Sequence, residues 1–167
     1  TKPAPASSAP ARENKLGHSP QQETVRKLRI CYEKNDEARY TSHLDTVRVF
    51  YRALRRANIT VAMSQGYHAH PKLSSGPPLS LGMTSLAEYM DLELLGRVPE
   101  ALPEAMNARL PHGFHVAEAK WFFDKQPALN ASINRQAYAI QWEGALDEEK
   151  LMSSVSSFMA GNRHDVV

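Results

Sequence analysis

Residues 40–82 read YTSHLDTVRVFYRALRRANITVAMSQGYHAHPKLSSGPPLSLG, which places an arginine-rich helix before a short strand and a loop dense in histidine, glycine and proline. Ser42 and Asp45 fit a capping box, in which two side chains satisfy free N–H groups at the start of a helix. The pattern predicts an amphipathic helix over residues 43–57. Its apolar side chains recur at helical spacing: Leu44, Val47, Tyr51 and Leu54, with Phe50 and Ala57 widening the face.

Four arginines lie on the opposite side of this helix: Arg48, Arg52, Arg55 and Arg56. One interpretation is a solvated face whose charges pair with carboxylates of neighbouring elements. The other is an anion-binding stripe, because guanidinium groups match phosphate oxygens in pairs and a row of them can follow a nucleic-acid backbone. No acidic residue between positions 46 and 57 offers compensation along the helix, which favours the second interpretation.

The loop carries side chains suited to binding: Gln65, Tyr67, His68, His70 and Lys72. Gly66 suits a backbone position with positive φ or the close approach of a ligand. An exposed tyrosine can stack on a nucleobase, and a lysine can hold a phosphate. The loop is therefore the second candidate site.

The histidines permit two further chemistries. His43 or His70 suits a general acid or base, because imidazole exchanges a proton near neutral pH. His43, His68 and His70 together would make a three-histidine metal site, but no second ligand motif accompanies them, so no metal site is predicted. The single cysteine, Cys31, lies in an apolar run and is predicted to be a small core residue rather than a nucleophile.

The flanking segments predict the fold. Strand patterns occupy residues 27–34, 60–63, 86–95 and 114–122, and a second helix pattern covers residues 99–109, with Pro103 tolerated in its first turn. Tyr89, Leu92 and Leu94 are the expected apolar members of the third strand. The order strand, helix, strand, strand, helix, strand is that of a ferredoxin-like split βαβ unit (βαββαβ), an α+β domain over residues 26–124.

The pattern then starts again. Residues 135–143 are strand-like and residues 147–161 predict a helix, so residues 133–167 are expected to form the start of a second, truncated ferredoxin-like unit. Residues 1–25 are rich in Pro, Ala, Ser and Gln with little to bury, which predicts a disordered linker. The chain opens on Thr rather than Met, so it is interpreted as part of a longer protein.

Composition narrows the class of protein. The chain has 167 residues, 42% hydrophobic, and a formal net charge of only +2, so any nucleic-acid surface must be local. One cysteine excludes a disulfide within the chain and suits a cytoplasmic location. No apolar run approaches the length of a membrane span, and no signal peptide is evident.

Several motifs resemble the radical SAM-linked protein family, domains of unknown function found beside or fused to radical-SAM proteins with a cobalamin-binding region. The similar stretches are YTSHLD, RALRRA, SQGYHAHPKLSSGPPLSLG and AEYMDLEL, and the resemblance covers residues 26–123 well and the remainder weakly. The loop pattern of that family is Ser-Gln-Gly-Phe-Asn-Pro-His-Pro followed by a base. The matching positions are Ser64, Gln65, Gly66, His70, Pro71 and Lys72, with Ser42, His43, Leu44 and Asp45 in the helix start. His68 and Ala69 stand where Asn-Pro is usual, which weakens any role for His68.

The resemblance implies an accessory domain. Any iron–sulfur cluster, S-adenosylmethionine or cobalamin would belong to the associated radical-SAM partner, since one cysteine cannot hold a four-cysteine cluster. The leading hypothesis is substrate recognition, with RNA (tRNA or rRNA) bound by the four helix arginines and by Gln65, Tyr67, His70 and Lys72. The alternatives are a metal-independent RNA endonuclease that uses His43 or His70, and a protein-docking domain for the radical-SAM partner.

Overall fold

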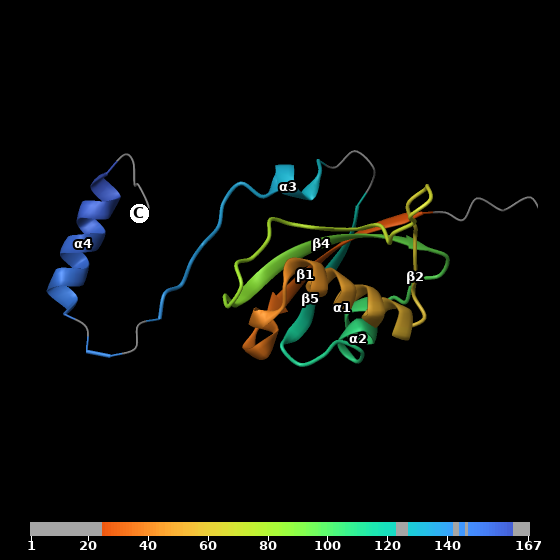
Figure 1. Cartoon of the computed structure of the whole chain (residues 1–167), viewed down its shortest axis with the longest axis horizontal. Helices are drawn as coiled ribbons and strands as arrows, with labels where there is room; N and C mark the ends of the chain where they lie inside the picture. The colour runs from red at the N-terminus through yellow and green to blue at the C-terminus, as the bar shows by residue number, and fades with distance from the viewer. Residues whose placement is uncertain (1–24, 123–126, 142–143, 146, 162–167) are drawn as a thin grey trace, which may run out of the picture. The chain divides into compact units, whose positions relative to one another are not determined.

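The computed structural model describes residues 25–122, 127–141, 144–145 and 147–161, and it divides the chain into two compact units, one ending at Asn134 and the other beginning at Arg135 (Figure 1). The first unit holds one antiparallel sheet with helices on its faces. Its elements are β1 (Arg26–Lys34), the 3-10 helix η1 (Asp36–Tyr40), α1 (His43–Arg56), β2 (Thr60–Val61), β3 (Leu73–Ser75), β4 (Ser85–Leu95), α2 (Leu102–Asn107), β5 (Phe114–Phe122) and α3 (Leu129–Ser132).

The strand order is β2-β4-β1-β5, with β3 also paired to β4. Both neighbours of the central β1 run antiparallel to it. If β2 and β3 are taken together as the second strand, this is the ferredoxin-like arrangement predicted from the order of elements. The prediction of an α+β ferredoxin-like domain is therefore confirmed.

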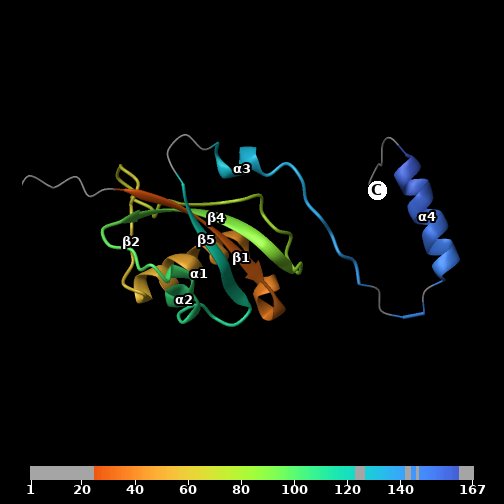
Figure 2. The same cartoon turned by 180° about the vertical axis from the view of Figure 1, so that it is seen from behind.

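Helices α1 and α2 cover one face of the sheet and enclose the core with it (Figure 2). Alternate residues of β1 and β4 point into this core, including Leu28, Ile30, Met90, Leu92 and Leu94. Phe50 of α1 lies at its centre, with ring centroids 4.6 Å from Tyr32 and 5.7 Å from Phe114. Aromatic pairs at these distances stabilise a core by about 0.5–1.5 kcal/mol each beyond the area they bury.

Three residues expected in the core lie elsewhere. Cys31 and Tyr89 are paired across β1 and β4 on the face away from α1 and α2, because side chains alternate along a strand and Met90 occupies the core position. Leu44 is 65% exposed, since the buried face of α1 runs instead through Thr46, Phe50, Ala53 and Leu54.

The second strand of the unit is interrupted. Thr60 and Val61 pair with Leu95 and Leu94, and β3 resumes the same edge at Leu73, which pairs with Leu92. Between these pieces the chain leaves the sheet at residue 62 and returns at residue 72, where the Lys72 N–H donates to the Ala62 carbonyl at 2.8 Å. β3 was predicted to be loop, because a three-residue strand is too short to show alternation.

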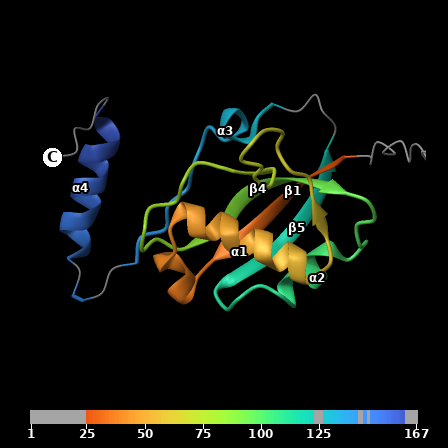
Figure 3. The ribbon, with the colours of Figure 1, turned by 45° about the vertical axis from the view of Figure 1, so that its right-hand side comes forward.

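The predicted helix over residues 99–109 is shorter, since α2 covers Leu102–Asn107, with Pro103 in its first turn as expected. α3 was not predicted. It packs on the face opposite α1 and α2, where Leu129 and Ile133 lie against Gly76 beside β3 (Figures 1 and 3).

The second unit contains α4 (Glu148–Ala160), which confirms the helix predicted at residues 147–161. Asp147 caps it by accepting from the Lys150 N–H at 3.1 Å. The strand predicted at residues 135–143 is wrong over 135–141, where no strand forms, and residues 142–143 lie outside the described part. A strand needs a partner for its N–H and C=O groups, and no described residue pairs with this segment. Residues 1–24, the expected linker, also lie outside the described residues.

Candidate functional site

The exposed face of α1 starts at a well-formed cap. The Asp45 N–H donates to Ser42 Oγ at 3.1 Å, and the Ser42 hydroxyl donates to Asp45 Oδ2 at 2.7 Å. Arg48 donates to the other oxygen of Asp45 at 2.9 Å. The Ser42 hydroxyl, and then Arg48, lower the pKa of Asp45 below its ordinary value because both stabilise the carboxylate.

This pairing corrects one premise of the sequence argument. Within residues 46–57 there is indeed no carboxylate, but Asp45 lies just before that window and takes Arg48 at a spacing of three residues. An acidic residue in the first turn was the signal that could have revealed the pair. Arg48 is therefore only partly available to an anion.

The other three arginines differ in their surroundings. Arg56 donates to the backbone carbonyl of Arg109 at 2.8 Å and so ties α1 to the end of α2. The Arg55 guanidinium lies 5.9 Å from the centroid of the Tyr51 ring. Neither Arg52 nor Arg55 has a carboxylate at ion-pair distance in the part of the chain that the structure describes, and both are exposed. These two are the most available cations of the helix.

The excursion from residue 62 to residue 72 forms a narrow hairpin. Met63 bridges Pro71, and the Ser64 N–H donates to the His70 carbonyl at 2.8 Å. Gly66 has φ +123°, a value that side chains disfavour, as the sequence anticipated. At the tip, Tyr67 is 98% exposed and touches only the edge of His68, with ring centroids 4.9 Å apart. An almost fully exposed aromatic ring is free to stack on a partner.

The two histidines with proposed roles have separate serine partners. His70 Nδ1 lies 2.8 Å from Ser64 Oγ in the hairpin, and His43 Nε2 lies 3.0 Å from Ser75 Oγ at the end of β3. Five residues separate positions 70 and 75, or roughly 16 Å along an extended chain. The fold thus holds His43 and His70 in different places. Ser64 and Ser75, which orient the two rings, were not anticipated, since neither serine stands in a recognisable motif.

Charges are also plentiful on the open face of the sheet, the face away from α1 and α2, but there they are paired. Arg29 donates to both carboxylate oxygens of Asp91, at 2.7 and 2.9 Å, and the pair is less than a quarter exposed. This hydrogen bonding raises the pKa of Arg29. Lys72, predicted to hold a phosphate, donates instead to Glu93 at 2.8 Å. The sheet face is consequently a poor cationic platform.

The predicted binding residues fall into two groups. The arginines lie on α1, below the sheet in Figures 1 and 2, whereas the hairpin stands above it, on the side of α3. His70 and Lys72 accordingly border a hollow with Phe122, Pro127 and Ala128 on the open face. The edge formed by β2 and β3 separates the two groups. The sequence analysis treated the arginines and the loop residues as one binding surface, whereas in the fold they lie on opposite sides of this edge.

Two negative findings apply to the described residues only. Among them, no three His, Cys, Asp or Glu side chains are grouped so that they could hold a metal ion. None of the helices in that part of the chain has the length and apolarity needed to cross a membrane.

Comparison with known proteins gives one match. The model of a family described as an uncharacterized protein conserved in bacteria (DUF2344) matches residues 27–167, which cover both units. No curated protein and no solved structure matches the chain.

Proposed function

The chain belongs to this family of uncharacterized bacterial proteins (DUF2344), and we propose that it is an accessory domain that binds RNA (tRNA or rRNA) for an associated radical-SAM enzyme. The association with a radical-SAM enzyme rests on the motif resemblance. The RNA-binding part rests on the surface of the first unit. In this proposal the chain recognises the substrate, and the partner carries the chemistry.

The observation that carries the proposal is the exposed pair Arg52 and Arg55 on α1, neither of which has a carboxylate at ion-pair distance among the described residues. Together with Arg48 and Arg56 they span about 12 Å along the helix axis, given a rise of about 1.5 Å per residue. Guanidinium groups at such spacing fit successive phosphates of a nucleic-acid strand and release its counterions on binding. Among the described residues, Arg52 and Arg55 lack the carboxylate at ion-pair distance that Arg29 and Lys72 have on the open face of the sheet.

The hairpin adds a second contact. Its tip presents Tyr67 for stacking, with Gln65 and His70 as hydrogen-bonding side chains nearby in the chain. Because the hairpin and α1 lie on either side of the β2 and β3 edge, a single strand that crosses this edge would touch both. The two contacts should then contribute separately to affinity.

The test is binding of the full chain to a mixed small-RNA pool across a salt series, with Arg52→Glu/Arg55→Glu as the variant. Wild-type affinity should fall steeply with salt. If each arginine neutralises one phosphate of a single strand, loss of both should reduce the magnitude of the slope of log K against log salt by about 1.4.

The matched control is Arg26→Glu/Arg97→Glu, which reverses the same number of charges at two exposed arginines near the end of β4. This variant should bind nearly as the wild type does. No RNA binding by the wild type at low salt would overturn the proposal. Binding to a purified radical-SAM partner in that case would favour a docking domain.

A further inference from the structure

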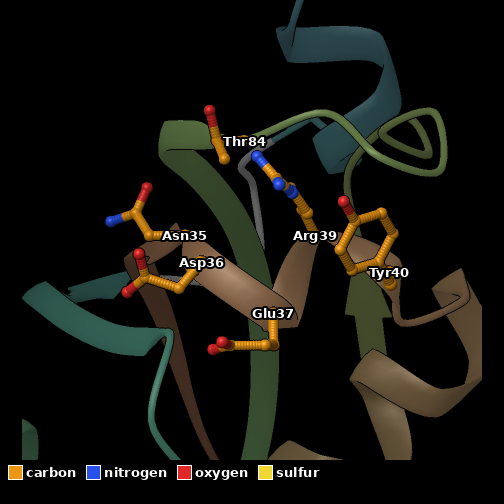
Figure 4. A pocket seen from close by; sticks show the side chains of 6 residues that line it. All are labelled: Asn35, Asp36, Glu37, Arg39, Tyr40 and Thr84. Carbon is orange, nitrogen blue, oxygen red and sulfur yellow. The ribbon is translucent and has the colours of Figure 1, made fainter.

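A hollow of about 530 Å³ lies beside η1, away from the surfaces considered so far. This volume is within the range of small-molecule sites. Six residues line it: Asn35, Asp36, Glu37, Arg39, Tyr40 and Thr84. Figure 4 shows Arg39 extending toward Thr84 with Tyr40 beside it, while Asp36 and Glu37 extend to the other side.

The backbone around the hollow is firmly held. The Asn35 N–H donates to the Gly113 carbonyl at 2.7 Å. Gly113 has φ +86°, and a Cβ there would lie 2.6 Å from the Asn35 carbonyl oxygen, so only glycine permits this approach. Beneath η1, the ammonium group of Lys34, a residue only 3% exposed, donates to the Thr41 carbonyl at 2.9 Å. The hollow is thus pre-formed.

The loop before β4 closes the other side. The Gly82 N–H donates to the Arg39 carbonyl at 2.9 Å, and the Met83 N–H donates to the Ser80 carbonyl at 3.2 Å. These bonds bring the turn that precedes Thr84 against η1. Two segments more than forty residues apart therefore build the hollow.

One nitrogen of Arg39 has no acceptor among the described residues. Its Nε is buried and has no hydrogen-bond partner among the described residues, whereas buried donors in folded proteins are almost always paired. The guanidinium carbon lies 4.8 Å from the centroid of the Tyr40 ring, which is itself 60% exposed. Because the Nε atom has almost no exposed surface, a ligand in the hollow would place its acceptor oxygen or nitrogen on the outer nitrogens of the Arg39 guanidinium, and a flat ligand could stack on the Tyr40 ring.

The carboxylates define the rest of the ligand. Asp36 and Glu37 are exposed acceptors, and His112 lies 3.8 Å from an oxygen of each. Two carboxylates against one guanidinium repel a phosphate or a carboxylate ligand. A neutral ligand with acceptors along one edge and donors along another fits this lining.

Guanine has this pattern. Its O6 and N7 are acceptors that an arginine binds in a bidentate manner, and its N1–H and N2–H groups are donors that carboxylates accept. Adenine and cytosine present an amino group at the place of O6, which would face the guanidinium. Unpaired RNA bases are commonly stacked on aromatic rings, and the exposed Tyr40 ring beside the hollow provides one.

We propose that this hollow binds one unpaired guanine of the RNA, with Arg39 on O6 and N7, Asp36 or Glu37 on N1–H and N2–H, and the base stacked beside Tyr40. This inference rests on the proposed RNA-binding function and adds base specificity to it. Its position supports it, because Tyr40 lies just before Ser42, the cap of the arginine-bearing α1 (Figure 3). A strand whose phosphates lie along α1 can place its next base at η1.

The test compares two single-stranded RNA probes, an all-uridine 12-mer and the same 12-mer with one central guanosine, in fluorescence-anisotropy titrations of the full chain. Wild type should prefer the guanosine probe by about fivefold or more, the discrimination of one good bidentate contact. Arg39→Gln should remove this preference, so that the two probes bind with equal affinity. Glu37→Gln, at a side chain that is 88% exposed and therefore outside the core, should reduce the preference.

Two controls separate the outcomes. Arg97→Gln, the same change at an exposed arginine beyond the far end of β4, should keep the preference. Arg52→Glu/Arg55→Glu should weaken both probes equally. Equal wild-type binding of the two probes, or a preference that survives Arg39→Gln, would overturn this inference alone. No binding of either probe would overturn the proposed function and the inference with it.

Discussion

The outer face of α1 and the open face of the sheet both carry many charged side chains, but the two faces differ in how many of these side chains form ion pairs. On the sheet, cations of β1, of β5 and of the residue before β3 meet carboxylates, as in Arg29 with Asp91, Lys120 with Glu118 and Lys72 with Glu93. On α1, Arg48 has Asp45, whereas Arg52 and Arg55 have no carboxylate at ion-pair distance in the described part of the chain.

The difference shows how to distinguish structural from functional charge. A partly buried charged group in an ion pair has lost part of its hydration and interacts with its partner instead. An incoming ligand must therefore compete with that partner. An exposed arginine without a carboxylate partner can bind an anion without breaking an existing ion pair. Removing a charge from the sheet face should therefore lower the stability of the fold, whereas removing a charge from the outer face of α1 should weaken RNA binding.

The largest expected effect on stability is at the sheet. Asp91→Ala leaves Arg29 half-buried without its bidentate acceptor and should lower the free energy of unfolding by roughly 2–3 kcal/mol. Urea denaturation would measure it. Arg52→Ala should change the same quantity by no more than about 0.5 kcal/mol, because it removes an exposed side chain. Similar losses from the two variants would show that the distinction between the faces is wrong.

The next effect concerns the hairpin. Tyr67→Ala removes a ring that is 98% exposed, so stability should not change, while RNA affinity should fall about tenfold if one base stacks there. Anisotropy titration at fixed salt measures it, and Leu86→Ala, at another exposed apolar residue, is the control. Unchanged affinity would remove the hairpin from the interface and leave α1 alone.

The smallest effect is at the cap of α1. Ser42→Ala should cost about 1 kcal/mol of stability, because it removes the acceptor of the Asp45 N–H. It should also raise the pKa of Asp45, which the Ser42 hydroxyl now holds down. A carboxyl group with a lowered folded-state pKa stabilises the protein above its unfolded pKa, and this contribution is lost as pH falls through the folded pKa.

NMR titration of the Asp45 carboxyl below about pH 5 would follow this change directly. The wild-type midpoint should lie below the ordinary aspartate value and should move upward in Ser42→Ala. An unchanged midpoint would mean that Arg48, rather than Ser42, sets the pKa, and that the arginine is more firmly engaged than its exposure suggests.

Regular hydrophobic patterns along the chain were sufficient to predict most helices and strands of the first unit. β1, β4 and β5 were predicted within one residue at each end and α1 within one, because alternating or helical spacing over nine or more residues leaves little ambiguity. The order of these elements then restricted the sheet to the ferredoxin-like arrangement. The same reasoning failed at residues 135–141, where a strand-like pattern has no strand to pair with among the residues that the structure describes.

Residue spacing also located the arginine face of α1, its cap at Ser42 and the glycine at the tip of the hairpin. It did not reveal that Lys72 is neutralised by Glu93, that His43 and His70 have separate serine partners, or that Arg39 and Thr84 meet at one hollow. Helices and strands follow from neighbours within about four residues, which are visible in the sequence. Lys72 and Glu93, His43 and Ser75, and Arg39 and Thr84 are instead 21, 32 and 45 positions apart, and only the register of strands and the packing of loops bring them together.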